Sequence, residues 1–123
     1  MRQSFIKVSF QREGIHKYPA AANLPGVEFL QHPHRHMFHF YVTLGVFHDD
    51  RDVEFILLKR ELEELYDGGT LQLNNQSCEM LADTLLDYME AYYSGRACKV
   101  EVYEDNENGG IVINDNYRRF AND

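Results

Sequence analysis

The stretch HRHMFHFYVTLGVFH, residues 34–48, decides the fold of this chain. Within residues 36–48 the odd positions are mixed in character, whereas the even positions are mostly apolar. These even positions are His36, Phe38, Phe40, Val42, Leu44 and Val46. Alternation with a period of two is the pattern of a strand that buries one of its faces. The sequence therefore predicts a strand over residues 36–48, with a His-Arg-His motif at its start.

The residues before this stretch predict another strand and a long connection. Residues 3–11 alternate in the same way, with Ile6, Val8 and Phe10 on one side, so we expect a half-buried strand. Residues 12–35 contain all three prolines of the chain and two glycines, which indicates an irregular segment. A connection of this length within a small domain is usually functional or mobile.

The residues after this stretch predict two helices and two further strands. Apolar residues at helical spacing indicate helices over residues 54–65 and 78–93. Alternating residues from Cys98 and an apolar run from Ile111 indicate the strands. The predicted order of elements is ββααββ. We therefore expect one α+β domain over residues 1–123, with a four-stranded antiparallel sheet and two helices packed on one face.

Composition and charge restrict the partners that this chain can have. The 123 residues include 12 lysines and arginines but 20 aspartates and glutamates, which gives a formal net charge of −8. Duplex nucleic acid and anionic membranes both attract positively charged proteins, so we expect neither as a partner. No apolar run reaches the roughly 20 residues that span a bilayer, and no export signal is visible. Two cysteines do not make a disulfide framework, and a cytoplasmic location is expected.

Four of the six histidines fall between residues 32 and 39, and this clustering predicts a metal site. His34 and His36 are two residues apart at the start of a strand, so their side chains point to the same side and can bind one ion. If the first two strands pair, His16 comes close to them. Three neutral ring nitrogens with one open position are typical of catalytic zinc. His39 has the opposite parity and is expected to point away. Loop histidines without a metal are the alternative.

Glu104 continues the inward-facing row of the strand that starts at Cys98. Burying a charge costs free energy unless the charge is paired, so we expect this carboxylate to have a hydrogen-bonding or charged partner. Its two oxygens suit a guanidine-like edge, such as the amino group and ring N–H of a pterin or guanine. The alternative is that the strand has already ended and that Glu104 is solvated.

Ser77, Cys78 and Glu79 open the second predicted helix. The serine is a candidate N-cap, and a cysteine in the first turn lies at the positive end of the helix dipole, which favours the thiolate. Cys78 is therefore a candidate acid/base, and a small buried residue beneath a capping serine is the alternative. Cys98 lies on the inward face of its strand and is expected to be inert.

Taken together, these residues resemble the 6-pyruvoyltetrahydropterin synthase and 6-carboxytetrahydropterin synthase family, the T-fold pterin enzymes, over about residues 3–113. Five motifs carry the resemblance, in the family's order and at similar spacing. They are His16, His34-Arg35-His36, Val53-Glu54-Phe55 with Leu58-Lys59, Gln76-Ser77-Cys78-Glu79-Met80-Leu81-Ala82, and Glu104. In the family these places hold a zinc-ligand histidine, a His-Gly-His motif, the starts of the two helices and a substrate-anchoring glutamate.

The resemblance implies a homo-oligomer, with a hexamer as the expected state, in which the sheets join into a β-barrel. Sites between subunits would hold zinc and a pterin-like ring. The three histidines named above would bind the zinc, and Glu104, Ser77 and Glu79 would bind the substrate. The implied activity is that of a lyase acting on a dihydropterin triphosphate.

The chain also departs from the family pattern. The family's catalytic cysteine lies four residues before the His-x-His motif, where this chain has Leu30. The family's Asp-His pair after the first helix is matched by Asp67 and Gly68, so the histidine is missing, and Arg35 replaces the glycine between the two histidines. Leucine neither takes nor gives a proton, and the family's mechanism therefore cannot run unchanged.

Three functional hypotheses follow. In the first, the chain is a divergent zinc-dependent enzyme on a dihydropterin triphosphate or a related purine-derived substrate, with Cys78 as acid/base and Asp67 as its helper. In the second, it binds a pterin, guanine or nucleotide without turnover. In the third, zinc only pins the long connection of a scaffold protein. A phosphate-bearing ligand would need local positive charge, for which Arg12, Lys17 and Arg35 are the candidates.

Overall fold

Two long paired strands form the centre of the structure. The computed structural model describes residues 2–122. In it, β1 (Ser4–His16) pairs antiparallel with β2 (His34–Val46) along the whole length of both strands. The even-numbered side chains of β2 between Phe38 and Val46 are buried, as the alternating pattern predicted. The even-numbered face of β2 therefore packs against the core, as expected.

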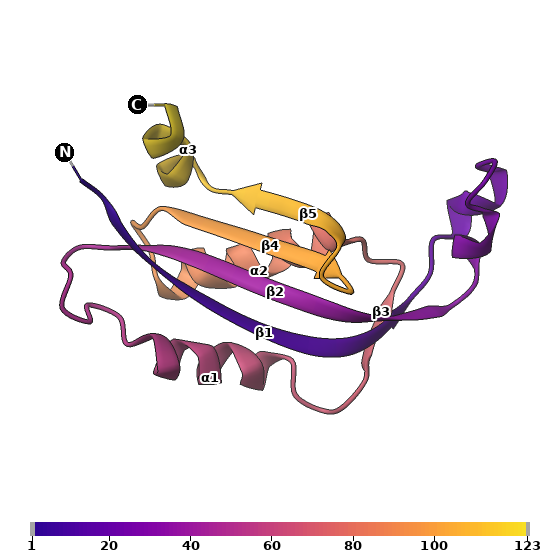
Figure 1. Cartoon of the computed structure of the whole chain (residues 1–123), viewed down its shortest axis with the longest axis horizontal. Coiled ribbons are helices and arrows are strands. Elements are labelled where there is room, and N and C mark those ends of the chain that lie inside the picture. Colours follow the sequence, from indigo (N-terminus) through magenta and orange to yellow (C-terminus); the bar gives the residue numbers. More distant parts are fainter. Residues whose placement is uncertain (1, 123) are drawn as a thin grey trace.

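The sheet has five strands and is mixed (Figure 1). β4 (Cys98–Glu104) and β5 (Asn108–Ile113) continue the antiparallel arrangement beyond β2, whereas the short β3 (Leu71–Asn74) pairs parallel with the end of β1. The strand order is β3-β1-β2-β4-β5. The α+β class is confirmed. The sheet has one strand more than predicted, is not antiparallel throughout, and is not closed into a barrel within this chain.

The two elements missing from the prediction lie where the sequence has no long periodic pattern. β3 has only four residues and follows a pair of glycines, so no alternation reveals it. The third helix, α3 (Asp115–Asn122), follows β5 directly. Its side chains Tyr117 and Phe120 pack against Phe5, with ring centroids 5.8 and 6.3 Å from that of Phe5. This contact ties the end of the described chain to the first strand.

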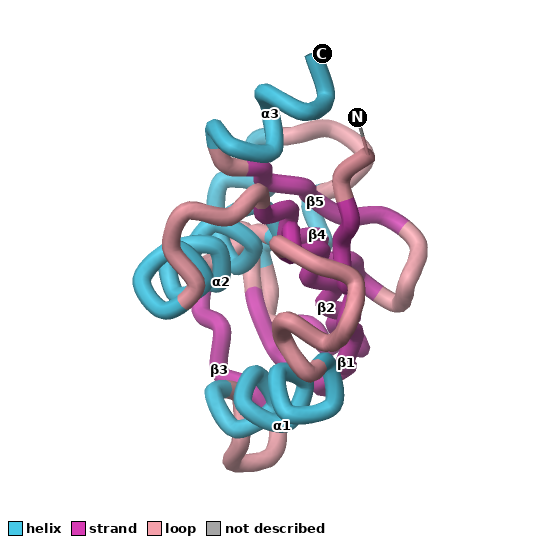
Figure 2. Tube along the Cα trace, turned by 90° about the vertical axis from the view of Figure 1, so that its left-hand side faces the viewer, coloured by secondary structure: helices cyan, strands magenta, loops and turns pink. Residues whose placement is uncertain are grey.

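Helices α1 (Phe55–Leu65) and α2 (Cys78–Tyr92) cover the same face of the sheet (Figure 2). The Ser77 hydroxyl accepts a hydrogen bond from the backbone N–H of Met80 at 3.1 Å, which confirms the predicted N-cap of α2. Both helices bury their apolar stripes against the even-numbered side chains of β1, β2 and β4, which form one core. No helix among residues 2–122 is long and apolar enough to cross a lipid bilayer.

Both central strands are longer than predicted at the end where the histidines lie. β1 continues to His16 and β2 begins at His34, so the irregular connection is reduced to residues 17–33. Gly14 does not interrupt β1. A Cβ atom at this position would lie 2.7 Å from Leu73 Cδ1 and 2.9 Å from Phe38 Cδ2, so a larger residue here would require these side chains to move.

The connection between β1 and β2 extends beyond the sheet (Figure 1). It contains two short 3₁₀-helices, η1 (Pro19–Asn23) and η2 (Glu28–Gln31). The backbone N–H of Tyr18 donates to the carbonyl of Leu30 at 2.7 Å, which closes the base of this segment. The connection is therefore folded, and its base lies beside the start of β2.

Candidate metal centre

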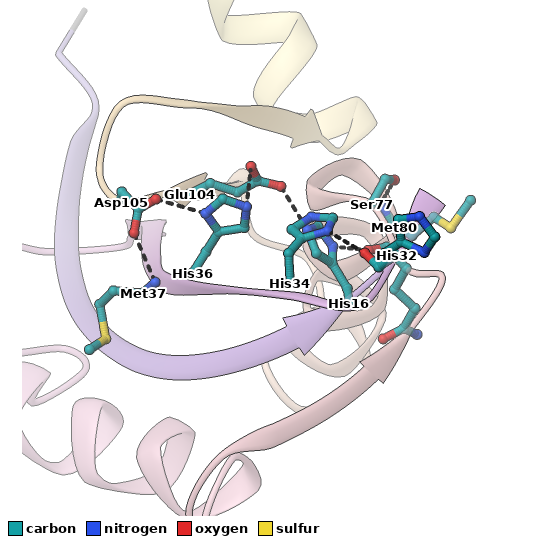
Figure 3. A network of polar contacts seen from close by, with 10 residues as sticks. His16, His32, His34, His36, Met37, Ser77, Met80, Glu104 and Asp105 are labelled. Carbon is teal, nitrogen blue, oxygen red and sulfur yellow. Dashed lines mark hydrogen bonds and ion pairs between the residues drawn. The ribbon is translucent and has the colours of Figure 1, made fainter. Parts of the chain in front are cut away.

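The pairing of β1 with β2 brings three histidines to one end of the sheet (Figure 3). His16 lies directly opposite His34, and His36 lies opposite Gly14, on the same face of β2 as His34. One nitrogen of each ring lies within 4.8 Å of the corresponding nitrogens of the other two. These three side chains could therefore bind one metal ion. His39 does not belong to the group, in agreement with its opposite parity.

The Nδ1 atom of each of these rings faces an oxygen acceptor. The three contacts are His16 Nδ1 to the carbonyl of Gln76 (2.9 Å), His34 Nδ1 to the carbonyl of His32 (2.8 Å), and His36 Nδ1 to Asp105 Oδ2 (2.7 Å). Carbonyl and carboxylate oxygens only accept hydrogen bonds, so in the neutral rings Nδ1 carries the proton and Nε2 keeps its lone pair. A histidine that binds a metal ion through Nε2 needs this tautomer, because the lone pair of Nε2 forms the bond to the ion.

Two of the Nε2 atoms have no hydrogen-bond partner among the described residues. Those of His16 and His36 are buried, and a buried polar atom without a partner is costly. Glu104 Oε1 lies 3.1 Å from Nε2 of His16, and Glu104 Oε2 lies 3.3 Å from Nε2 of His36, but neither contact has hydrogen-bond geometry. An ionised carboxylate and an unprotonated Nε2 are both acceptors. A cation beside these two Nε2 atoms would give both of them a partner, so the residues present fit a metal ion.

A pocket of about 300 Å³ opens beside the histidines. Besides His16 and His34, its lining includes the residues that the sequence analysis singled out on other elements. These are Leu30, Ser77, Cys78, Glu79 and Glu104. Leu30 comes from the connection after β1, Glu104 from the end of β4, and the other three from the start of α2. Segments far apart in the sequence therefore meet in one hollow next to the candidate metal ligands.

Asp67 is not brought to this pocket. It is exposed in the loop after α1, and its carboxylate accepts a hydrogen bond from the backbone N–H of Gly68 at 2.9 Å. It does not belong to the residues that line the pocket. The structure of this chain therefore gives no support to Asp67 as a helper of Cys78.

Cys78 lies in the pocket wall. Cys78 is only 6% exposed. Burial raises the pKa of its thiol to about 12, and the charges of Glu104 and Glu79 add to this effect. Burial and two nearby carboxylates thus outweigh the helix dipole, whose effect is modest. These surroundings oppose the expected acidic thiol, and the role of Cys78 as an acid/base stays a prediction. Cys98 is 1% exposed and burial likewise raises its pKa to about 12, as expected for an inert core residue.

Of the three predicted anion-binding cations, only Lys17 lines the pocket. The Arg35 guanidinium lies 3.0 Å from the carboxylate of Glu13. The Arg12 guanidinium donates to the backbone carbonyls of Tyr66 and Glu63 at 3.2 and 3.3 Å. Both arginines are thus paired with other parts of the chain and do not line this pocket.

Sequence reasoning missed the groups that orient the histidines. Two of them are backbone carbonyls, which carry no sequence signal. The third is the side chain of Asp105, whose position directly after Glu104 was the available clue. The hydrogen bond from the backbone N–H of Met37, followed by the contact with the imidazole of His36, lowers the pKa of Asp105. This carboxylate is therefore ionised at neutral pH.

Comparison with known proteins gives a fold neighbour and no family. No protein-family model matches the chain, and no curated protein matches it either. Among solved structures, an uncharacterized protein from Wolinella succinogenes is similar with a TM-score of 0.70 and 14% sequence identity. The match covers 94% of this chain and 100% of that chain. At this identity the similarity extends to the fold alone.

Proposed function

We propose that this chain is a zinc-dependent enzyme of the 6-pyruvoyl- and 6-carboxytetrahydropterin synthase type, acting on a dihydropterin triphosphate or a related purine-derived substrate. One observation carries the proposal: three histidines whose Nδ1 atoms face oxygen acceptors have ligand nitrogens within 4.8 Å of one another, and Glu104 lies beside two of them. Three neutral imidazoles with room for a further ligand are the donor set of catalytic zinc sites. When bound, zinc would polarise an oxygen of the substrate and make a neighbouring proton easier to remove.

The pocket suits a flat heterocycle with several hydrogen-bonding groups. Its volume of about 300 Å³ lies at the lower end of small-molecule sites. Asn75, Gln76 and Asn108 line it together with the carboxylates of Glu79 and Glu104. Amides and carboxylates at the edge of a pocket can bind the amino and ring N–H groups of a pterin or purine. In this proposal Glu104 anchors the ring, and the helix start at Ser77 and Glu79 contacts its other edge.

An enzyme of this type also needs a group that moves protons. Leu30 lines the pocket where the resemblance places the family's catalytic cysteine, and it has no proton to exchange. The thiol of Cys78 is neutral, with a pKa raised to about 12, so it is a poor base. These two observations favour a second candidate function, in which the same pocket binds a pterin, guanine or nucleotide without converting it.

One experiment separates the two candidates. The purified protein is analysed for zinc and incubated with a dihydropterin triphosphate, with and without a chelator, and product and unchanged ligand are quantified by chromatography. Zinc-dependent turnover supports the enzyme, whereas zinc-dependent binding with full recovery of the ligand supports the binding module. The variant Glu104→Gln serves as the control, because an amide no longer accepts two hydrogen bonds from a guanidine-like edge. If the wild-type protein neither binds nor converts the compound, both candidates fail for this ligand class.

We also propose that the chain assembles into a homo-oligomer, with a hexamer as the expected state. β3 covers only Gly14–His16 of the outer edge of β1, and no strand among residues 2–122 covers the rest of that edge or the outer edge of β5. Unpaired edges of this kind associate readily, and joining them between subunits into a closed barrel removes them. Native mass spectrometry tests the proposal, and a monomer at micromolar concentration would overturn it.

A further inference from the structure

Asp105, the first residue of the turn between β4 and β5, binds two consecutive residues of β2 (Figure 3). Its Oδ2 atom accepts a hydrogen bond from Nδ1 of His36 at 2.7 Å, and its Oδ1 atom accepts one from the backbone N–H of Met37 at 3.0 Å. The backbone N–H of Asp105 also donates to the carbonyl of Met37 at 2.7 Å. Three hydrogen bonds thus fix the carboxylate relative to the ring of His36.

These contacts occur where the pairing of β2 with β4 has ended. The last pair in that register is Phe38 with Glu104, so His36 lies beyond it. Asp105 and Asn106 adopt left-handed backbone conformations, with φ of 53° and 56°, in the turn that leads from β4 to β5. On the opposite side of the turn, the hydroxyl of Tyr41 donates to Oδ1 of Asn106 at 2.6 Å. The turn is therefore anchored to β2 on both sides, and these contacts hold Asp105 in place.

We propose that Asp105 is a positioning residue of the metal centre, which keeps Nδ1 of His36 protonated and Nε2 directed toward the metal ion. The inference rests on the proposed metal-binding function. A carboxylate behind a metal-bound imidazole fixes the tautomer and ring orientation and makes the ligand nitrogen more basic. The corresponding partners of His16 and His34 are backbone carbonyls. Of the three groups that contact the Nδ1 atoms, only that of Asp105 is a side chain, so only this one can be changed by substitution.

The variant Asp105→Asn tests this role with little change in shape. An asparagine has one carbonyl oxygen, so it cannot accept hydrogen bonds from both His36 and Met37 through separate oxygens. If its amino group faces His36, Nδ1 must become the acceptor, and the proton moves to Nε2, where it blocks the metal. The matched control is Glu107→Gln, which removes one carboxylate from the same turn at an exposed residue.

The measurement is the dissociation constant for zinc, obtained by competition with a chromophoric chelator, for the wild-type protein and both variants. We expect Asp105→Asn to bind zinc about 10- to 100-fold more weakly. The dissociation constant of Glu107→Gln should stay within about twofold of wild type, because only a group in direct contact with a metal-binding histidine has an effect of this size. Circular dichroism and thermal unfolding in the presence of a chelator check that the variants are folded. Absorption spectra of the cobalt-substituted proteins should differ for Asp105→Asn alone.

A second measurement needs no variant. Nitrogen-15 NMR of the histidine rings in the metal-free wild-type protein should find His36 with its proton on Nδ1, and a proton on Nε2 would overturn the inference. Equal zinc affinity of Asp105→Asn and wild type would also overturn it, while leaving the metal site itself intact. If the wild-type protein binds no zinc, the proposed function fails and the inference fails with it. A weaker affinity confined to Asp105→Asn supports the positioning role.

Discussion

His16 and His34 lie directly opposite each other in the antiparallel pairing of β1 with β2, and their ring centroids are 4.6 Å apart. The same register stacks Phe10 on Phe40, with ring centroids 4.7 Å apart. A shift of the pairing by one residue would move the side chains of one strand to the other face of the sheet. The alternating pattern that builds the core therefore also determines the geometry of the candidate metal centre.

Replacing His36 by alanine should remove bound zinc. The wild-type protein is expected to retain about one zinc ion per chain after dialysis, because three imidazoles suffice for a stable site. With two ligands left, retention should fall close to zero in elemental analysis. The control is His39→Ala, which removes a histidine of opposite parity from the same strand and should leave the zinc content unchanged. A full complement of zinc in the His36→Ala protein would contradict the three-histidine centre.

The long periodic patterns of the sequence predicted most of the fold. The alternation from Phe38 to Val46 and the helical spacing of the apolar residues in α1 and α2 extend over many residues, so that no local exception hides them. The errors concern short or tightly packed segments. Gly14 belongs to a continuous strand because it pairs with His36, and its close packing against Leu73 and Phe38 is a tertiary contact that no sequence window reveals.

The candidate site was predictable to the extent that it follows strand parity. Parity placed His34 and His36 on one face and Glu104 at the end of an inward-facing row, and these side chains do lie close together. The environment of Cys78 was not predictable, because its pKa depends on burial and on carboxylates from distant segments. The role of Asp105 was also hidden, since it depends on the hydrogen bonds that this turn residue accepts from His36 and Met37 of β2.

Lys17 should contribute to the binding of phosphate-bearing ligands, whereas Arg35 should not. Lys17 lines the pocket, while Arg35 is paired with Glu13 at 3.0 Å. Lys17→Gln is expected to weaken binding of a phosphate-bearing pterin by about two- to fivefold at low salt, the usual effect of one exposed charge. The difference should shrink as the ionic strength rises. Arg35→Gln is the matched control. A larger loss for Arg35→Gln than for Lys17→Gln would show that the ligand lies elsewhere.

Cys78 should react slowly with alkylating agents at neutral pH. Its raised pKa of about 12 leaves little thiolate at pH 7.5, compared with a free cysteine whose pKa is about 8.5. After allowance for the greater nucleophilicity of a more basic thiolate, iodoacetamide should label it about a hundredfold more slowly than a small thiol. Mass spectrometry of the peptides distinguishes it from Cys98. Labelling at the rate of a free thiol would indicate a thiolate and would restore Cys78 as an acid/base candidate.

The free energy of unfolding should fall in alkaline solution. Burial raises the pKa of Tyr66 to about 12 and that of the Cys98 thiol also to about 12. In the unfolded chain the pKa is about 10 for tyrosine and about 8.5 for cysteine, so the unfolded state loses these protons at lower pH than the folded state. Their contribution to stability is thus complete below about pH 8.5 and decreases as the pH rises toward 12, by up to about 1.4 kcal/mol per pH unit for each group.

Urea unfolding between pH 8 and pH 11 measures this decrease, and Tyr66→Phe isolates one group. The phenylalanine preserves the ring that packs against Phe10 and Phe40 but has no proton to lose. The variant should therefore lose less stability above about pH 10 than the wild-type protein. Identical pH profiles for the two proteins would mean that the Tyr66 hydroxyl is not perturbed by burial.

The substitution Leu30→Cys distinguishes an altered enzyme from a binding module. Leu30 lines the pocket, and the hydrogen bond from Tyr18 N–H to its carbonyl, at 2.7 Å, holds it at the base of the connection. The resemblance places a catalytic cysteine at this position. A well-placed acid/base contributes about 10²- to 10⁴-fold to a rate, so we expect turnover of a dihydropterin triphosphate to rise at least about tenfold. Leu30→Ala controls for the enlarged pocket, because it adds space without a thiol. If Leu30→Cys binds zinc and ligand normally but turns over no faster than Leu30→Ala, the pocket lacks the other groups of a proton relay, and binding without conversion becomes the better account of the chain.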